Sequence, residues 1–394
     1  MRILMVHPHD ICSSAEPWTR RVKCLAGELV KAGCQVKLVY FSLSLAERRK
    51  AHLLDGCEAI PLSRSPSLAV FLNNILKLIS LGKQADIIHF QKCHHYASIP
   101  AIISAFINKK PLHYDWDDWE EMIWYESCGR NLHSRFVGFL FKALERLLPV
   151  LSDTLSVSSE YLRKRALSFG VKENNVFLAP VGAALDQFNP IVDGGRVKET
   201  HSITGPLVLY VGQLHGAQYI DLFIDAANIV LHKNSGITFM IVGEGFMEGN
   251  LKNLALRLGI SDKVIFTGAV AHNEIPCYIA AADVCVAAFR DTKVTRSKSP
   301  LKIAEYMSCG RAIVASNVGE VRRMLGGVGI LAEPDNATSL AEGILRLLDS
   351  KELRAQLGKF ARARAEEKYN WPRTAANLLS AYQYAANGTV RHSK

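Results

Sequence analysis

The stretch TRSKSPLKIAEYMSCGRAIVAS, residues 295–316, joins a basic segment to a helix of about ten residues and then to a strand of small residues. Ser299 fits the N-cap of this helix and Pro300 its first position. Unpaired amide groups at such a helix start, together with the helix dipole, favour an anion there. The stretch therefore predicts a helix–strand unit with an anion-binding end.

The same alternation of strands and helices runs through both halves of the chain. Apolar runs typical of strands occur in the first half at 2–7, 35–41, 85–90, 111–116, 154–158 and 175–180. The second half has them at 207–212, 237–243, 263–268, 282–289, 312–316 and 329–334. Helical patterns lie between them, for example at 18–31 and 135–148. This pattern predicts an α/β protein with two doubly wound, Rossmann-like domains, whose ligands lie beyond the carboxyl ends of the strands.

The domain division follows from length and from one polar segment. A chain of 394 residues exceeds one ordinary core. Residues 189–206 contain Gly and Pro and lack periodicity, which is typical of a linker. We expect an N-terminal domain at 1–195, a C-terminal domain at 196–370, and an inter-domain cleft as the binding site. Residues 371–394 should form a last helix, with Pro372 in its first turn, that packs back on the N-terminal domain.

Composition excludes several classes of protein. The nine cysteines form no C-x-x-C pair, which argues against a disulfide framework and a thiolate zinc site. No apolar run reaches the roughly 18 residues that span a bilayer, and the N-terminus lacks the features of a signal peptide. We therefore expect a cytoplasmic protein. The net charge of +10 suggests an anionic partner, whether phosphates, a lipid surface or nucleic acid.

Charge is concentrated just before the helix of the opening stretch. Residues 290–302 hold five basic side chains and one acidic one. This composition suits a phosphate-bearing ligand. Glu305, within the second turn of the helix, is suited to accept hydrogen bonds from the two hydroxyl groups of a ribose. The alternative is a solvated basic loop with an ordinary surface glutamate.

Several segments, in order, resemble the retaining glycosyltransferases of family 4, which have the GT-B fold. SPLKIAEYMSCGRAIVAS resembles their donor-binding segment. LAPVGAALDQFNP resembles the end of their first domain, and LVLYVGQL followed by YIDLFIDAA the start of their second. FMIVGEG, VIFTGAVAHNEIPCYIAAADVCVAAF and YNWPRTAANLLSAY follow in the family's order. The resemblance covers most of the chain and is strongest from Val157 to Tyr382.

The resemblance implies a nucleotide diphosphate sugar held by the C-terminal domain and an acceptor held by the N-terminal domain. It also implies retention of the anomeric configuration, with no cofactor and no metal required. Glu305 would bind the nucleotide ribose, and the turn at Ser299, Pro300, Leu301 and Lys302 would hold the diphosphate.

This chain departs from the family pattern at three positions of that site. Ser297 stands where the family has a first glutamate. After Gly212, Gln213 and Gln218 stand where an arginine and a lysine usually hold the diphosphate. Because charge-assisted contacts are the strong ones, we expect replacements from the basic segment, with Lys302 and Lys298 first and Arg290 after them.

The N-terminal domain offers a different set of polar residues. HYDWDDWEEMIWYE, residues 113–126, combines acidic side chains with three tryptophans just after a predicted strand. Asp117 and then Asp118 are the candidate base or hydrogen-bond acceptor for the acceptor substrate. The alternatives are a divalent ion on paired carboxylates and a plain polar loop. Candidate acceptor-binding residues are Trp116 and Trp119, by ring stacking, and His7, His9, Ser13, Ser14, His94 and His95.

The sequence and its resemblance thus predict a retaining glycosyltransferase, of the hexosyltransferase class, that moves a sugar to a glycan or lipid-linked acceptor. The alternatives are a nucleotide-sugar epimerase of the same fold and a nucleotide-sugar-binding protein that has lost catalysis. SLAVFLNNILKLISLGK and HSRFVGFLFKALERLL have apolar stripes with basic flanks, which predicts peripheral contact at the cytoplasmic face of a membrane. Nucleic acid is not an expected partner, because the basic residues lack aromatic interleaving.

Overall fold

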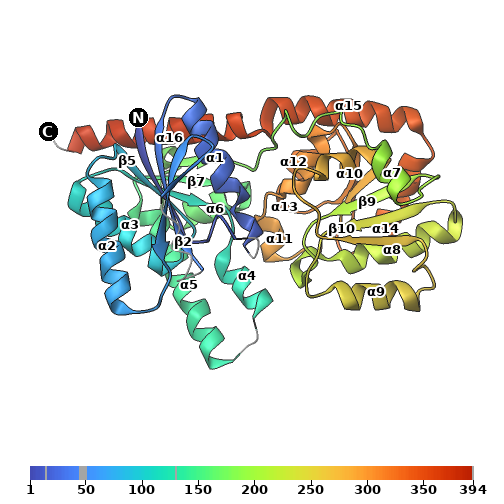
Figure 1. The fold of residues 1–394 in the computed structure, drawn as a ribbon, viewed down its shortest axis with the longest axis horizontal. Coiled ribbons are helices and arrows are strands. Elements are labelled where there is room, and N and C mark those ends of the chain that lie inside the picture. Colours follow the sequence, from blue (N-terminus) through green and yellow to red (C-terminus); the bar gives the residue numbers. More distant parts are fainter. Residues whose placement is uncertain (14–15, 44–50, 129–130, 393–394) are drawn as a thin grey trace. The chain divides into compact units, whose positions relative to one another are not determined.

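The computed structural model describes residues 1–13, 16–43, 51–128 and 131–392, which form two compact units (Figure 1). Unit 1 comprises Met1–Pro180 and Trp371–Lys394, and unit 2 comprises Val181–Asn370. The boundary between the two units lies after Pro180, earlier in the chain than the predicted boundary after residue 195. Ala183 and Phe188 belong to the hydrophobic core of unit 2, and the amide of Ala183 donates to the carbonyl of Tyr369. The segment that looked like a linker is therefore preceded by residues already packed in unit 2.

Unit 1 is built on an eight-stranded sheet. Its order is β3-β4-β2-β1-β5-β6-β7-β8, and all pairs are parallel except β3 with β4. The strands are β1 (Arg2–His7), β2 (Gln35–Ser42), β3 (His52–Leu54), β4 (Cys57–Ser63), β5 (Ile87–Gln91), β6 (Leu112–Trp116), β7 (Thr154–Val157) and β8 (Val176–Leu178).

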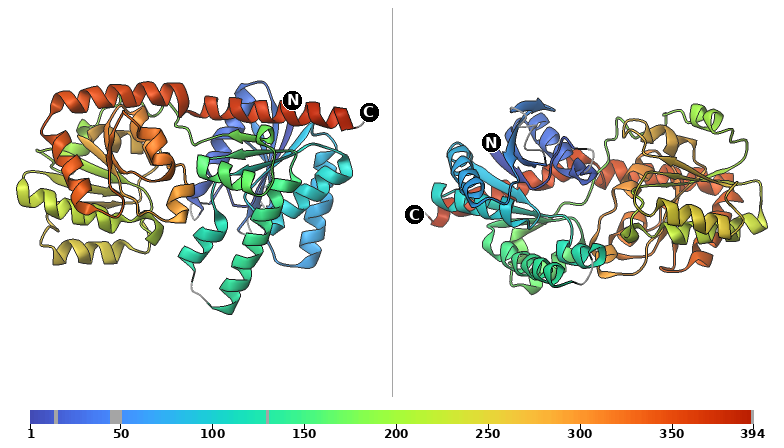
Figure 2. Two further views of the ribbon diagram at one scale, coloured as in Figure 1. Left: turned by 180° about the vertical axis from the view of Figure 1, so that it is seen from behind. Right: turned by 60° about the horizontal axis from the view of Figure 1, so that its bottom comes forward.

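Helices cover both faces of this sheet. Right-handed crossovers put α1 on one face and the helices that lead toward β8 on the other. The terminal helix α16 packs against α1 and against β6, β7 and β8 (Figures 1 and 2). The helices of this unit are η1 (Pro17–Thr19), α1 (Arg20–Lys31), α2 (Leu68–Gly82), α3 (His95–Asn108), α4 (Glu120–Ser127), α5 (Leu132–Leu151), α6 (Glu160–Ser168), η2 (Glu173–Asn175) and α16 (Trp371–His392).

Unit 2 is built on a six-stranded, wholly parallel sheet of order β11-β10-β9-β12-β13-β14. Its strands are β9 (Leu207–Val211), β10 (Thr238–Val242), β11 (Val264–Gly268), β12 (Val284–Ala287), β13 (Ala312–Ser316) and β14 (Ile330–Ala332). Its helices are α7 (Gly195–Thr200), η3 (Gly216–Gln218), α8 (Ile220–Lys233), α9 (Glu248–Arg257), α10 (Ile275–Ala281), α11 (Lys293–Ser297), α12 (Leu301–Ser308), α13 (Gly319–Leu325), α14 (Ala337–Leu348) and α15 (Lys351–Lys368).

The strand order reverses once in each sheet. In unit 1, β1 lies between β2 and β5, and in unit 2, β9 lies between β10 and β12. Connections leave such a point in opposite directions, so a crevice forms beyond the carboxyl ends of the two central strands. The predicted α/β class with two doubly wound units is confirmed. It directs attention to the residues that follow β1 and β5, and to those that follow β9 and β12.

Among the described residues, no helix is long and apolar enough to cross a membrane.

We predict that the contact between α16 and the sheet stabilises unit 1. The hydroxyl of Tyr382 lies 2.7 Å from Nδ1 of His89, and both side chains are fully buried. Tyr382→Phe would leave that nitrogen without a partner, which costs about 1–3 kcal/mol. Urea unfolding should show the loss.

The control is Tyr384→Phe, because Tyr384 lies two residues along the same helix with nearly half its surface exposed. Its effect should stay within about 0.5 kcal/mol. Equal unfolding midpoints for the two variants would show that the buried hydrogen bond contributes nothing.

Candidate functional site

Lys302 is the central cation of the crevice in unit 2. It belongs to the first turn of α12, and its ammonium Nζ reaches the end of β9. There it donates to the hydroxyl of Tyr210, at 2.7 Å, and to Oε1 of Gln218, at 3.2 Å. The same Nζ lies 3.9 Å from the centre of the Tyr210 ring. All of these partners are electrically neutral.

This ammonium has no carboxylate within ion-pair distance among the residues that the structure describes. Burial lowers its pKa to about 7, and the positive charge of Lys298 adds to that shift, whereas Glu305 opposes it. Burial also lowers the pKa of His215 to about 4, and Lys298 and Lys302 contribute. Lys302 thus places positive charge in the crevice that no described carboxylate balances by an ion pair, which is the electrostatic setting of an anion site.

Gly212 makes the space that this ammonium occupies. It follows β9 directly and has φ +149°, a conformation that glycine adopts readily. A Cβ at this position would lie 2.7 Å from Nζ of Lys302 and 3.2 Å from the hydroxyl of Tyr210. The absence of a side chain at Gly212 therefore allows Lys302 to enter the crevice.

The start of α12 differs from the prediction in one detail. The helix begins at Leu301, with Pro300 as its N-cap and no side chain capping it. Ser299 was the predicted N-cap, but its hydroxyl accepts a hydrogen bond from the amide of Val181 instead. Because proline at the cap offers no hydrogen-bonding side chain, the first-turn amides have no side-chain acceptor. They add a second feature that favours an anion beside Lys302.

Glu305 lies one turn further along α12 and is 6% exposed. Its Oε1 is 3.1 Å from Nε2 of His272, a side chain that is about one-third exposed. A carboxylate held at the edge of a crevice by one histidine keeps further acceptor sites for ligand hydroxyls. The predicted ribose ligand is therefore in a suitable place, next to an imidazole that the sequence did not indicate.

Other predicted donor-binding residues are engaged elsewhere. Arg290 pairs with Asp221, at 2.5 Å, and with Asp335, at 3.3 Å. Ser297 is fully buried in α11, where its hydroxyl donates to the carbonyl of Val294. The prediction that these two residues contact the donor does not agree with their surroundings. The charge of Arg290 is balanced by two carboxylates, and the side chain of Ser297 is enclosed. Lys298 is half-buried, and Gln213 follows Gly212 half-exposed.

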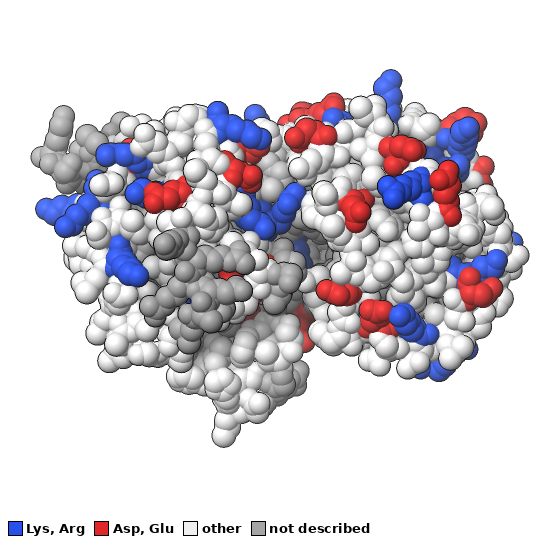
Figure 3. Space-filling model, in the orientation of Figure 1, with Lys and Arg blue, Asp and Glu red and all other residues white. Residues whose placement is uncertain are grey.

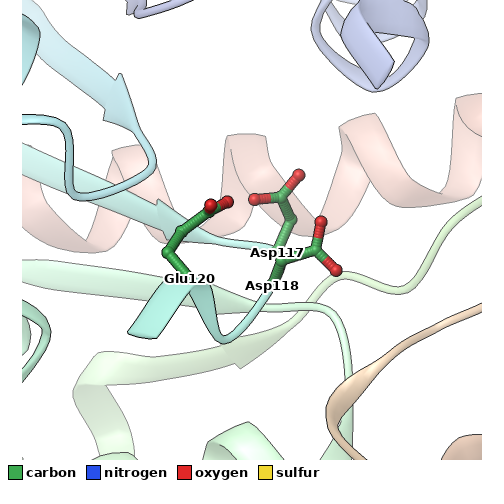
Figure 4. A group of neighbouring side chains, drawn as sticks. All are labelled: Asp117, Asp118 and Glu120. Atoms are coloured by element: carbon green, nitrogen blue, oxygen red, sulfur yellow. The ribbon is translucent and has the colours of Figure 1, made fainter. Parts of the chain in front are cut away.

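The crevice of unit 1 has the opposite charge balance, with several carboxylates around one cation. Lys92 follows β5 in a left-handed conformation, with φ +64°, and is only 4% exposed. Its Nζ lies 2.5 Å from Glu120 Oε1, 3.3 Å from Asp118 Oδ2 and 3.4 Å from Asp117 Oδ1. The carboxylates come from the loop after β6 and the start of α4 (Figure 4).

These three carboxylates are close enough together to hold a metal ion. However, the ammonium of Lys92 already lies among them and supplies a positive charge where a cation would bind. The prediction that no metal is required remains a prediction, and the contacts of Lys92 give it a physical reason. Sequence reasoning had missed this lysine entirely.

The surroundings of Asp117 favour its protonated form. Burial raises its pKa to about 7; Lys92 opposes the shift, and the charges of Asp118 and Asp115 add to it. Its Oδ2 accepts from the side-chain amide of Gln91 at 2.9 Å. A carboxyl group that titrates near neutral pH at the carboxyl end of a strand is suited to take up and release a proton.

Histidines extend this cluster. The ring of His7 hydrogen-bonds through Nδ1 to Oε1 of Gln91 at 2.7 Å, which links it to Asp117. His9 contacts Glu16 at 2.8 Å, and its ring lies 4.9 Å from that of His94. Burial lowers the pKa of all three imidazoles, which favours their neutral form. Neutral imidazoles can both donate and accept hydrogen bonds, as a hydroxyl-rich ligand requires.

The tryptophans of this segment do not fit their predicted role. Trp116 is fully buried and stacks on Tyr114 and Phe169, and its indole N–H donates to Glu145. Trp119 is 4% exposed, and the guanidinium of Arg165 covers its ring at 3.7 Å. The prediction that they stack on a sugar ring is wrong, because both rings pack inside the unit.

Three predicted acceptor-binding residues remain: His95, Ser13 and Ser14. His95 is exposed at the start of α3. Ser13 follows β1 in a turn, where its amide donates to the carbonyl of Asp10. Ser14 lies outside the described residues.

Comparisons with known proteins agree with this architecture. Residues 205–350 match the family model of the Glycosyl transferases group 1. The glycosyltransferase from Rickettsia africae ESF-5 superposes with a TM-score of 0.75 at 16% identity, covering 98% of each chain. Anabaena Alr3699/HepE in complex with UDP gives a TM-score of 0.74 at 18% identity, covering 96% of this chain and 99% of that one. The chain has the GT-B fold, and residues 205–350 are similar to the group 1 glycosyl transferases.

A curated relative supports the same family. The alpha-D-kanosaminyltransferase of Streptomyces kanamyceticus is 28% identical over 247 residues. The match spans 61% of this chain and 61% of the relative. The resemblance to GT-B glycosyltransferases noted in the sequence is thus confirmed, whereas activity and substrates rest on the site itself.

Four residues of these crevices were not predicted from the sequence: Lys92, Tyr210, His215 and His272. Tyr210 belongs to the apolar run of β9. Its hydroxyl accepts a hydrogen bond from Lys302 only because α12 lies against the end of that strand. A lysine directly after a buried strand, such as Lys92 after IIHFQ, was a usable signal. Lys92 was not predicted as a site residue because a single lysine usually lies in solvent.

We predict that Gly212→Ala weakens the binding of a UDP-sugar at least tenfold. The new Cβ would displace Nζ of Lys302, and the left-handed backbone would be strained by about 1–3 kcal/mol. Calorimetric titration measures the affinity.

Gly216→Ala is the matched control, since a Cβ at Gly216 in the same loop meets nothing within 4 Å. Its affinity should match that of the wild type. If both variants bind as the wild type does, the position of Lys302 is unimportant for donor binding.

Proposed function

We propose that the protein is a retaining glycosyltransferase that moves a sugar from a nucleotide diphosphate sugar to a glycan or lipid-linked acceptor. The observation that carries the proposal is the ammonium of Lys302, which is surrounded by neutral partners in the crevice of a group 1 glycosyl transferase domain. A diphosphate would provide the missing negative charge, and charge-assisted hydrogen bonds to phosphate are strong. The UDP found in the structural neighbour supports a nucleotide as the ligand.

The donor would be held by three features of unit 2. Lys302, with Lys298 beside it, would bind the diphosphate together with the first amides of α12. Glu305 would accept hydrogen bonds from the ribose hydroxyls, with His272 orienting its carboxylate. Gln218, which stands where the family has a lysine, would assist by holding the Lys302 ammonium. The lost charge of the family pattern is thereby replaced from α12.

In the reaction, the bond between the anomeric carbon and the diphosphate oxygen breaks, and a bond to the acceptor oxygen forms on the same face of the sugar. The proton of the acceptor hydroxyl passes to the leaving phosphate oxygen. Positive charge at Lys302 and Lys298 would stabilise the departing diphosphate. Asp117, with His7 and His94 in the same cluster, would accept a hydrogen bond from the acceptor and orient it.

The proposal includes a cytoplasmic location with contact to a membrane surface, which would bring a lipid-linked acceptor within reach. It requires no cofactor besides the donor. A screen of UDP-, GDP-, ADP- and dTDP-sugars by thermal shift identifies the donor, because a ligand that binds the native state raises apparent stability.

A second candidate is a binding protein without transferase activity, which the enclosed Ser297 favours because a usual contact to the donor sugar is missing there. Donor binding without transfer to a broad panel of acceptors would support this candidate. The epimerase alternative would instead give an isomerised donor in the absence of any acceptor.

We predict that Lys302→Met lowers donor affinity by about 100-fold, the effect of removing a charge-assisted contact of about 3 kcal/mol. In the wild type, affinity should fall as the pH rises through about 7, because the free amine loses its proton in that range. Titrations of a UDP-sugar from pH 6 to pH 8 measure both effects. A UDP-sugar is the suitable ligand because its diphosphate does not titrate there.

Lys302→Arg provides the control, since arginine stays protonated throughout this range. It should bind with weak dependence on pH. Pronounced tightening of the Lys302→Met variant at low pH would assign the titration to another group and contradict the proposal.

We predict that Asp117→Asn reduces the turnover number by about 100-fold, the usual effect of misplacing a reactant by about 1 Å, because the carboxylate that orients the acceptor is lost. Donor affinity should not change, because the donor residues belong to unit 2. The wild-type rate should rise with pH through about 7 as Asp117 ionises.

Glu126→Gln removes an exposed carboxylate from the neighbouring helix and serves as control. Steady-state rates with a donor and an acceptor from the screen provide the measurement. An Asp117→Asn variant with wild-type turnover would exclude a role for this carboxylate in transfer.

A further inference from the structure

The outward face of α5 in unit 1 is apolar although no part of the described chain covers it. Seven large apolar side chains of this helix are between 36% and 84% exposed: Leu132, Phe136, Phe139, Leu140, Leu147, Val150 and Leu151. The helix also buries a complete inner face, which includes Phe141 and Leu148. A surface helix normally presents polar residues to water, so this face is suited to contact something other than water.

The arrangement of side chains around α5 is ordered. At 3.6 residues per turn, the exposed apolar residues, with Ala143 among them, fill a continuous arc of about 120°. Arg135, Lys142 and Arg146 lie together in a narrow arc directly beside it, and all three are exposed. The inner face fills the remainder. The helix thus has three sectors: packed, apolar and basic.

Acidic groups are missing from the outer sectors. The one acidic residue of α5, Glu145, is fully buried and accepts hydrogen bonds from the amides of Glu120 and Glu121. The exposed acid of the adjoining helix, Glu126, belongs to α4. Figure 3 shows the charged residues on one face of the molecule. An apolar strip with a purely basic border is the composition of a helix at a lipid–water interface.

The charge border distinguishes between two kinds of partner. In a symmetric pair of identical chains the same surface faces itself, and the three cations of one copy would approach those of the other. Anionic lipid headgroups, by contrast, complement the basic border while the acyl region accepts the apolar strip. Because the described helices do not cross a membrane, this contact would be peripheral.

We propose that the outer face of α5, residues 132–151, docks the protein on a bilayer that contains anionic lipid. It deepens the proposed membrane contact and rests on that part of the proposed function, but it does not depend on sugar transfer. Phe136, Phe139 and Leu140 enter the acyl boundary, and Arg135, Lys142 and Arg146 contact phosphate groups of the lipids. Helix α2 carries a second exposed strip, Leu68, Leu72 and Leu76.

The test is co-sedimentation of the full chain with vesicles. Vesicles of phosphatidylcholine mixed with phosphatidylglycerol should bind the wild type, and pure phosphatidylcholine vesicles should bind it at least tenfold more weakly. Phe136→Ser combined with Phe139→Ser should reduce binding to the anionic vesicles at least tenfold. Reversing the border charges, with Arg135→Glu, Lys142→Glu and Arg146→Glu, should remove the preference for anionic lipid.

The matched control is Phe246→Ser, which removes an equally large side chain that is 81% exposed in unit 2. It should bind vesicles as the wild type does. Thermal stabilisation by a UDP-sugar, measured on each variant, separates loss of membrane binding from loss of fold or donor binding. The proposal is overturned if the wild type ignores anionic vesicles, if the double serine variant binds them equally well, or if the wild type instead forms a dimer that the double variant abolishes.

Discussion

The crevice of unit 2 depends on one ammonium group, that of Lys302, held among neutral partners. Removing a charge from water is unfavourable unless an opposite charge or good hydrogen bonds replace the water. Tyr210 and Gln218 supply hydrogen bonds but no negative charge, and Lys298 makes the local balance still more positive. The fold maintains this unfavourable group through Gly212, which gives it space, and through α12, which carries it to the end of β9. A ligand with negative charge would relieve that cost.

The crevice of unit 1 has the opposite charge balance. There Lys92 is surrounded by Asp117, Asp118 and Glu120, so negative charge exceeds positive charge. The excess is reduced because burial favours the protonated form of Asp117. Both crevices lie where the strand order reverses, so the same topological feature creates one site for anions and one for hydrogen-bond donors such as hydroxyl groups. Such a division suits the two substrates of a transferase.

Sequence reasoning found the elements of regular, buried strands and missed what depends on tertiary contact. Every predicted strand corresponds to an observed one, because continuous apolar runs such as 207–212 mark fully buried parallel strands. The edge strand β3 and its neighbour β4 were not predicted, since HLL is short and CEAIPLS is mixed in polarity. In the site, the basic segment and the resemblance to family 4 indicated Lys302 and Glu305. They could not show that Asp221 and Asp335 balance Arg290, or that packing would enclose both tryptophan rings.

Proton uptake on donor binding tests the central claim most directly. If a diphosphate binds beside Lys302, it raises the pKa of an ammonium that titrates near pH 7 in the free protein, so binding must take up protons. Calorimetric titration of the identified nucleotide sugar at pH 7, repeated in buffers of different ionisation enthalpy, measures the number of protons taken up on binding. We expect a net uptake of about half a proton in the wild type, and none in Lys302→Arg. Donor binding with no proton uptake in the wild type would contradict the account.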